Sequence, residues 1–279
     1  MSTKKVWFIT GASKGFGLEF IKQLLAKGDA VAATSRSLSQ LKNAASTDDA
    51  NFLPLEMEIT NEASVQRAIA ATVAAFGRID MLVNNAGYGL VGGVEELTDA
   101  EARRNFDVNV FGSLNIIRAA MPQLRKQGSG HIVNFSSIAG VTGSFPAFGI
   151  YCATKFAVNG FTEALALEAK PFGIKTTLVL PGYFRTNFLE SDSIVTPQNQ
   201  MQEYTEVRAM QQAHEEQIRG NQPGDPVKGV AEVIKMTEAE NAPLYFFLGS
   251  DAVKMAEQKM DFLKSEIEGW REASTITDF

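Results

Sequence analysis

The chain is poor in the residues that build disulfide frameworks and metal centres. Its 279 residues include one cysteine, Cys152, and two histidines, His131 and His214, which stand far apart. A single cysteine excludes an intrachain disulfide and fits a reducing compartment. Neither histidine belongs to a cluster with metal-ligand spacing, so no metal is expected. Cys152 has no histidine near it in sequence, which favours a packing role over a catalytic one.

Long apolar runs and an excess of basic residues are also missing. The N-terminus passes from Met1 directly into the four apolar residues 6–9, too few for a signal segment or a membrane span. The net charge of -6 disfavours a nucleic-acid partner. We therefore expect a cytoplasmic protein with no membrane span and no nucleic-acid partner.

The chain does contain a regular alternation of strand-like and helix-like segments. Its apolar content of 45% is enough for a sizeable core. Short β-branched runs predict strands at 6–10, 30–34, 52–57, 80–83, 132–135, 176–180 and 244–248. Such alternation implies βαβ units and a doubly wound, Rossmann-type parallel sheet of α/β class. No linker or repeat interrupts it, so residues 1–279 are expected to form one domain.

Capping residues mark where several of the intervening helices begin. Ser37 with Gln40, and Thr98 with Glu101, have capping-box spacing, and Thr60 is the expected cap of a helix over 61–76. The helix that begins after Thr98 is expected to reach about residue 126, through Asn109, with a break near Gly112. Further helices are expected over 15–27, 151–170, 226–238 and 251–269.

The region after Pro181 departs from this alternation. Residues 183–225 hold no strand candidate, but Met201, Tyr204, Val207 and Met210 recur every third residue. This spacing favours one or two helices, which could form a mobile substrate lid at 187–225 or simply complete the core. The last predicted helix, rich in Glu, is expected to combine a solvated face with an apolar stripe of Val253, Met260 and Leu263.

A glycine-rich loop separates the first strand from the first helix. Gly11, Gly15 and Gly17 are spaced Gly-x-x-x-Gly-x-Gly. Backbone amides at such a helix N-terminus can bind a pyrophosphate, although an ordinary tight turn would also explain the glycines.

Tyr151 and Lys155 form a second pattern. Their spacing of four places them on one helix face, where a cation can lower the pKa of a phenol and make it a general acid/base. An exposed helix face is the alternative for an isolated pair.

The remaining motifs lie after successive predicted strands, where a parallel sheet binds its ligands. Taken in order, they are Thr10-Gly11-x-x-x-Gly15-x-Gly17, Asn84-Asn85-Ala86-Gly87, Asn109, Ser137, Tyr151-x-x-x-Lys155 and Pro181-Gly182. Over residues 5 to 186 the chain resembles the short-chain dehydrogenase/reductase family. The resemblance implies seven parallel strands and hydride transfer between a nicotinamide cofactor and a carbonyl or alcohol.

The resemblance also implies roles for individual residues. Tyr151 would be the acid/base, Lys155 would hold the ribose and lower the Tyr151 pKa, Ser137 would bond the substrate oxygen, and Asn109 would support a water relay. The cofactor-binding residues would be Gly11, Ser13, Lys14, Gly15, Phe16, Gly17, Ser35, Arg36, Glu58, Ile59, Asn85, Ala86, Gly87, Tyr151, Lys155, Pro181, Gly182, Phe184 and Thr186. Two departures stand out: Glu58 replaces the usual aspartate, and Ser137 lies one residue further than usual from Tyr151, which leaves Ser136 as a rival.

Residues near the end of the second strand favour NADP(H) as the cofactor. Thr34-Ser35-Arg36 contains no carboxylate to accept a bond from the ribose 2′-hydroxyl. Arg36, together with Lys14 in the glycine loop, could instead bind a 2′-phosphate.

The substrate is expected to be a hydrophobic ketone, aldehyde or secondary alcohol, such as a steroid-, retinoid- or fatty-chain-like compound. Its pocket would use Ser137, Tyr151 and the apolar or aromatic residues Val141, Phe145, Phe148, Tyr183, Phe184 and Phe188. A non-catalytic dinucleotide sensor and a carrier-linked 3-oxoacyl reductase are the alternatives. A homodimer or homotetramer is expected by family analogy, with the helix over 151–170 as a candidate face.

Overall fold

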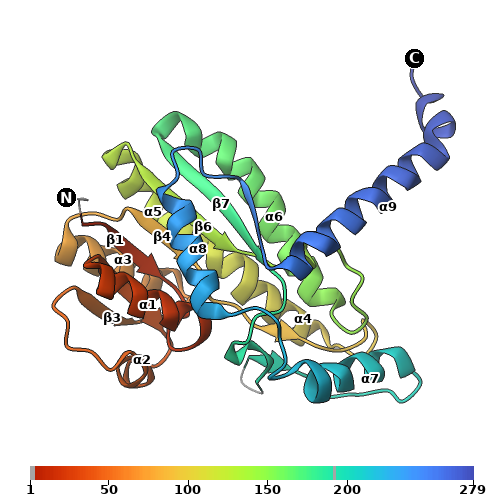
Figure 1. Cartoon of the computed structure of the whole chain (residues 1–279), viewed down its shortest axis with the longest axis horizontal. Coiled ribbons are helices and arrows are strands. Elements are labelled where there is room, and N and C mark those ends of the chain that lie inside the picture. Colours follow the sequence, from red (N-terminus) through yellow and green to blue (C-terminus); the bar gives the residue numbers. More distant parts are fainter. Residues whose placement is uncertain (1–3, 191–192) are drawn as a thin grey trace.

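A computed structural model describes residues 4–190 and 193–279 of the chain. Seven strands form one parallel sheet in the order β3-β2-β1-β4-β6-β7-β9 (Figure 1). They are β1 (Val6–Ile9), β2 (Ala30–Ser35), β3 (Phe52–Glu56), β4 (Met81–Asn84), β6 (Gly130–Phe135), β7 (Ile174–Pro181) and β9 (Tyr245–Leu248). The predicted doubly wound sheet is confirmed. Its winding reverses between β1 and β4, the place where such sheets bind ligands.

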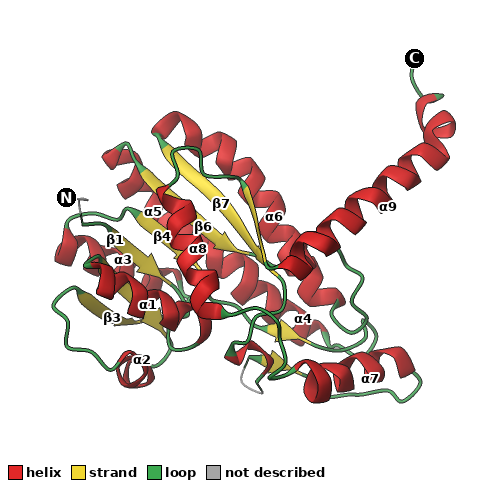
Figure 2. Ribbon diagram, in the orientation of Figure 1, coloured by secondary structure: helices red, strands yellow, loops and turns green. Residues whose placement is uncertain are grey.

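Helices cover both faces of this sheet and complete three layers (Figure 2). One layer contains α1 (Gly15–Lys27), α2 (Leu38–Ala45) and α8 (Pro226–Glu238). The other contains α3 (Glu62–Phe76), α5 (Gly112–Gln127) and α6 (Gly149–Ala169). Each helix turns an apolar face to the sheet, so that two separate apolar cores form.

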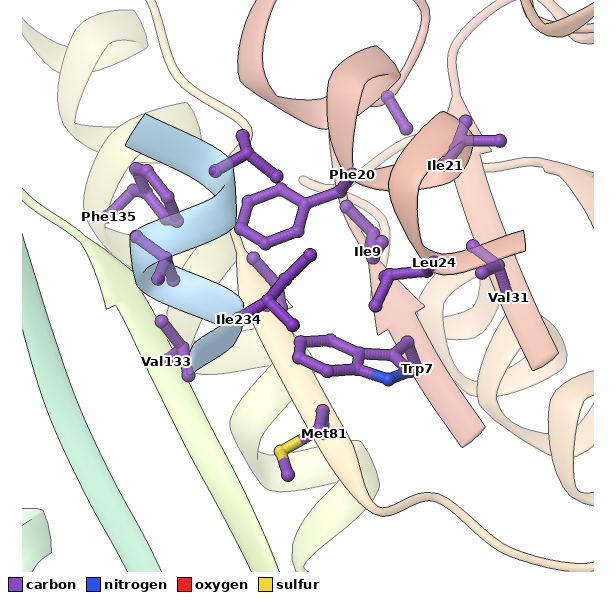
Figure 3. Close-up of a cluster of buried hydrophobic side chains, with 14 of the residues drawn as sticks. Trp7, Ile9, Phe20, Ile21, Leu24, Val31, Met81, Val133, Phe135 and Ile234 are labelled. Carbon is purple, nitrogen blue, oxygen red and sulfur yellow. The ribbon is translucent and has the colours of Figure 1, made fainter. Parts of the chain in front are cut away.

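The core under α1 and α8 fixes the start of α1 against the sheet (Figure 3). Trp7, Phe20 and Leu24 are completely buried there, and the Phe20 and Phe135 rings meet edge to face at 5.9 Å. Burial of each such side chain stabilises the fold by roughly 1.5–3 kcal/mol. The loop between β1 and α1 is therefore held firmly at the carboxyl end of the sheet.

The helix caps agree with the sequence in part. Thr98 and Glu101 form the complete predicted capping box at the start of α4 (Asp99–Phe106). The Ser37 side chain accepts the Gln40 amide, which is one half of the predicted box at α2. The cap of α3 is Asn61, not Thr60, because the Thr60 amide and hydroxyl both donate to the Glu58 carboxylate.

The long helix after Thr98 is interrupted by a π-helical turn over Asp107–Phe111. The interruption comes before Gly112, which is itself helical as the first residue of α5. A Cβ on Gly112 would lie 2.9 Å from Ile59 Cγ1. The glycine therefore allows close packing and does not break the helix.

Two short strands lie outside the main sheet. β5 (Gly89–Leu90) and β8 (Ile194–Val195) pair in parallel, so the prediction of no strand within 183–225 is wrong. A strand of two residues is too short for an apolar or β-branched pattern to be recognised in the sequence. Part of the predicted insertion at 187–225 and of the domain at 1–279 falls on residues 191–192 and 1–3, outside the described residues.

The helix α7 (Thr205–Gln212) lies within the predicted lid. Val207 is buried, and Tyr204 and Met210 pack against the same cluster as Phe148 and Tyr151. The three-residue spacing therefore marks side chains that belong to a core and lie beside the predicted site.

The final helix, α9 (Ser250–Thr275), leaves the body of the molecule and carries the C-terminus away from it (Figure 1). It passes the predicted end at Gly269 because that glycine lies in a solvent-exposed helix, where it costs only about 1 kcal/mol. No helix in the described ranges is long and apolar enough to cross a membrane.

Candidate active site

A cavity of about 1080 Å³ opens at the carboxyl end of the sheet. The glycine loop forms one wall, beside the N-terminus of α1. A Cβ on Gly17 would lie 2.6 Å from the Gly11 carbonyl oxygen and 2.9 Å from Asn85 Nδ2, so only glycine fits where α1 meets the loop. Asn85 Nδ2 donates to the carbonyls of Thr10 and Gly11 and joins this loop to the end of β4.

Most of the predicted site residues line this one cavity. The predicted cofactor residues that do so are Gly11, Ser13, Lys14, Gly15, Phe16, Ser35, Arg36, Glu58, Ile59, Asn85, Ala86, Gly87, Tyr151, Lys155, Pro181, Gly182, Phe184 and Thr186. Ser137, Phe145, Phe148, Tyr183 and Phe188 line it as well. Gly17 lies behind the loop that it shapes. Val141 is not in the lining, because it packs with Ile138 and Val158 under the site.

Ser35 and Arg36 stand at the end of β2, on the wall next to the glycine loop. Arg36 is exposed, and Ser35 Oγ accepts the amide of Ser37. Glu58, across the β2–β3 edge, is exposed and engaged by Thr60. A guanidinium therefore stands at this corner of the cavity, with a carboxylate further along the same edge.

Tyr151 lies in the first turn of α6 with its side chain in the cavity. Burial raises the pKa of its phenol, and a side-chain hydrogen bond with Ser137 opposes that rise. Ser137 caps the 3-10 turn Ile138–Gly140, with its oxygen accepting the Ala139 amide at 3.1 Å. The neighbouring Ser136 points elsewhere, and its hydroxyl donates to the Lys155 carbonyl. The geometry thus favours Ser137 over Ser136 as the serine beside Tyr151, despite the longer spacing.

Lys155 lies one turn further along α6 and is buried. Its Nζ donates to the Phe135 carbonyl at 2.9 Å and lies 5.8 Å from the centre of the Tyr151 ring. Burial lowers the pKa of Lys155 to about 8. The expectation that Lys155 lowers the Tyr151 pKa is not met in this structure. Burial of the phenol is the largest influence on its pKa, and the ammonium is directed at a backbone oxygen.

Asn109 projects from the π-helical turn behind this pair. It accepts the Tyr88 amide and donates to the Tyr88 carbonyl and to Thr154 Oγ1. A Cβ on Gly87 would lie 3.1 Å from Asn109 Oδ1 and 3.8 Å from Lys155 Nζ. Asn109 is therefore close to Lys155, although it does not line the cavity. Such π-helical turns are frequent at functional sites.

His214 is a site residue that the sequence did not reveal. It lies in a second π-helical turn, Ala213–Ile218, and lines the cavity. Its Nδ1 bonds the Met210 carbonyl, so its Nε2 accepts the Tyr183 hydroxyl at 3.0 Å, and its ring packs 4.8 Å from that of Phe148. Burial lowers the His214 pKa, so the ring is neutral here. No local pattern could have joined residues 31 positions apart.

The segment predicted to form a lid is fastened to the body through a buried carboxylate. The Glu96 side chain is completely buried and accepts two bonds from Arg208 at 2.6 and 2.7 Å. It also accepts the amides of Gly93 and Met201. Arg208 on α7 is thus held to the segment that follows β5.

These features define a class of protein. A glycine loop at a helix N-terminus shares one cavity with a buried Ser–Tyr–Lys group, as in enzymes that transfer hydride to or from a bound dinucleotide. A family model described as short chain dehydrogenase matches residues 5–194. The chain therefore belongs to the short-chain dehydrogenase family and is an oxidoreductase.

Individual relatives agree with this assignment. An oxidoreductase from Botryotinia fuckeliana is 34% identical over 274 residues, which cover 97% of this chain and 98% of the relative. A 3-ketodihydrosphingosine reductase from Bacteroides thetaiotaomicron is 37% identical over 241 residues, 86% of each chain. The crystal structure of a short-chain dehydrogenase from Streptomyces avermitilis, 37% identical, superposes with a TM-score of 0.91 over 99% of this chain and all of the other.

Two further solved structures contain a bound nicotinamide cofactor. A Burkholderia cenocepacia short chain dehydrogenase in complex with NADP has 26% identity and a TM-score of 0.73 over 95% of this chain and 96% of the other. A Brucella melitensis 3-ketoacyl-(acyl-carrier-protein) reductase complexed with NADH has 25% identity and the same TM-score over 89% and 98%. Relatives with this fold thus bind either cofactor.

Proposed function

We propose that the chain is an NADP(H)-dependent oxidoreductase that interconverts a hydrophobic ketone or aldehyde and the matching alcohol, with Tyr151 as general acid/base. The observation that carries the proposal is the placement of Tyr151. Its phenol touches Ser137, lies one helical turn from Lys155, and faces a cavity with a glycine loop at one end and aromatic side chains at the other.

The cavity walls fit a dinucleotide. The narrow cradle at Gly11 and Gly17 and the start of α1 suit a pyrophosphate. Arg36, with Ser35 and Lys14, suits a ribose 2′-phosphate, while Glu58 and Ile59 lie where an adenine would reach. Asn85, Ala86 and Gly87 would flank the chain of the cofactor, and Pro181, Gly182, Phe184 and Thr186 would hold its nicotinamide end.

The state of the buried groups favours proton donation by Tyr151. Because its pKa is raised, Tyr151 is a protonated phenol at neutral pH and can give its proton to a carbonyl oxygen. Ser137 would hold that oxygen, and Lys155, with a pKa of about 8, is largely cationic at pH 7 and stabilises the phenolate that forms. When bound, the nicotinamide supplies the hydride to the carbonyl carbon in reduction. Asn109 would keep Lys155 in contact with a water chain that returns the proton.

The side chains at the far end of the cavity support the proposed substrate class. Phe145, Phe148, Phe188 and Tyr183 surround the space beside Tyr151, and the Tyr151 and Phe188 rings lie 5.9 Å apart. This lining favours an apolar substrate over a charged one. The relative named as a 3-ketodihydrosphingosine reductase supports a ketone.

A panel of ketones, aldehydes and secondary alcohols, with carrier-linked 3-oxoacyl groups included, tests the proposal through the NADPH absorbance band. Tyr151→Phe should lower kcat by about 10²–10⁴-fold with cofactor binding almost unchanged. Tyr245→Phe, a change of the same kind at the exposed sheet edge, is the control and should keep full activity. A Tyr151→Phe enzyme within tenfold of wild type would remove Tyr151 from the reaction, and binding without any turnover would favour a sensor.

A further inference from the structure

The outer part of α9 exposes a row of large apolar side chains. Met260 is 58% exposed, Leu263 46%, Ile267 58% and Trp270 68%. Scattered apolar residues are normal on a surface, but a contiguous row marks an interaction site. The body of the chain buries only Ala252 and Ala256 of this helix.

The spacing of these residues is that of a coiled-coil seam. Val253, Ala256, Met260, Leu263, Ile267 and Trp270 follow one another at alternating intervals of three and four. This is the a/d pattern of a heptad repeat, which presents one narrow apolar stripe to a partner helix. Ala256 is buried against the body, so the exposed part of the stripe consists of Val253 and the residues from Met260 to Trp270. The charged residues at the flanking e and g positions are Glu257, Lys259, Lys264, Glu266 and Arg271. Arg271 forms a salt bridge with Glu268 of its own helix. Within the described ranges, none of the other four charges forms a salt bridge.

We propose that α9 pairs in antiparallel orientation with α9 of a second copy of this chain. In a parallel pair, Lys259 would face Lys264 of the second copy, and the two cations would repel each other. Glu266 would face Arg271 of the second copy, and this attraction would only offset that repulsion. In an antiparallel pair that sets Met260 against Leu263 of the second copy, Lys259 instead faces Glu266 of the second copy. In the same register Glu257 faces Lys264 of the second copy. Charge complementarity thus selects both the partner and its direction.

This pairing would act on the active-site loops through the base of α9. Asp251 Oδ2 accepts the Tyr183 amide at 2.7 Å, and Ala252 and Ala256 pack against Ile138 and Phe145. A second copy held along α9 therefore restrains the segments that line the substrate end of the cavity.

Charge reversal tests the pairing in the full-length protein by analytical ultracentrifugation. Lys259→Glu and Glu266→Lys should each weaken the association about tenfold, since each turns two attractive pairs into repulsive ones. An equimolar mixture of the two variants should recover wild-type affinity, because every such pair between unlike chains is again attractive. Tighter association of Lys259→Glu alone would show a parallel pair and overturn the proposal, as would failure of the mixture to recover.

Two further variants separate pairing from general charge and folding effects. Lys254→Glu makes the same charge change outside the seam and should leave association unchanged. Ile267→Asp places a carboxylate in the seam and should weaken association by at least about a hundredfold, with an unaltered circular dichroism spectrum because Ile267 is exposed. In Ile267→Asp the mass of the assembly should fall to half that of wild type, whether or not another face also joins copies. Equal masses of wild type and Ile267→Asp would show that no second copy covers this helix. A wild type that stays monomeric and binds anionic lipid vesicles through α9 would show the same.

Discussion

Removal of the Arg208 guanidinium should loosen the segment predicted to form a lid without unfolding the sheet. Arg208 is the only cation that the described structure places on the completely buried Glu96 carboxylate, which otherwise accepts just two backbone amides. Breaking one side of a buried ion pair costs about 3–5 kcal/mol, because the remaining charge stays buried and uncompensated. In Arg208→Met the segment can avoid this cost by opening locally, so that water reaches Glu96.

Hydrogen exchange measured by mass spectrometry provides the assay. A loss of about 3 kcal/mol corresponds to opening that is roughly a hundredfold more frequent over residues 196–218, with the sheet unchanged. Because α7 packs against Phe148 and Tyr151, KM should rise more than kcat falls. Cofactor and substrate together should increase protection of this segment in wild type and restore it in part in the variant.

Arg103→Met is the matched control. Arg103 pairs with Asp99 on the surface, where both side chains are largely exposed, so its removal should change neither exchange nor KM. Equal exchange in Arg208→Met and wild type would refute the idea that the buried ion pair holds the lid.

Three other predictions concern single residues. Arg36→Ala should weaken NADPH binding by about 10–100-fold and barely change NADH binding, because a charge-assisted contact contributes roughly 1.5–3 kcal/mol. Fluorescence titrations of both cofactors measure this effect. Tighter binding of NADH than of NADPH by wild type would contradict the NADP(H) assignment. Burial lowers the His131 pKa to about 4, whereas the unfolded chain binds the same proton near 6.5. Stability should therefore fall by about 3 kcal/mol as pH drops from 6.5 to 4, and urea titrations of His131→Asn should lose most of that dependence. Asp251→Ala should lower the unfolding free energy by about 1–3 kcal/mol in the same titrations and raise KM, since it leaves the Tyr183 amide unpaired; an unchanged KM would show that this contact does not position the site.

The sequence alone was enough for the sheet, its winding and the candidate reaction residues. Strand-forming runs and cap residues determine the structure of residues only a few positions away in the sequence. The strand Val6–Ile9, the Thr98 capping box and the glycine loop could therefore all be recognised from short stretches. Tyr151 and Lys155 were found for the same reason, because four residues on a helix fix their relation.

Only the tertiary structure decided the environment of these groups. Burial depends on every element packed around a side chain, so the raised Tyr151 pKa, opposite to the expectation, could not be seen in the spacing. The His214–Tyr183 contact and the Arg208–Glu96 pair join residues 31 and 112 positions apart, and no local pattern encodes such closures. For the apolar stripe on α9, the sequence revealed the residues but not their exposure. Its apolar side chains were visible in the sequence, but only the fold shows that the body leaves them uncovered, because α9 extends beyond the elements that could bury them.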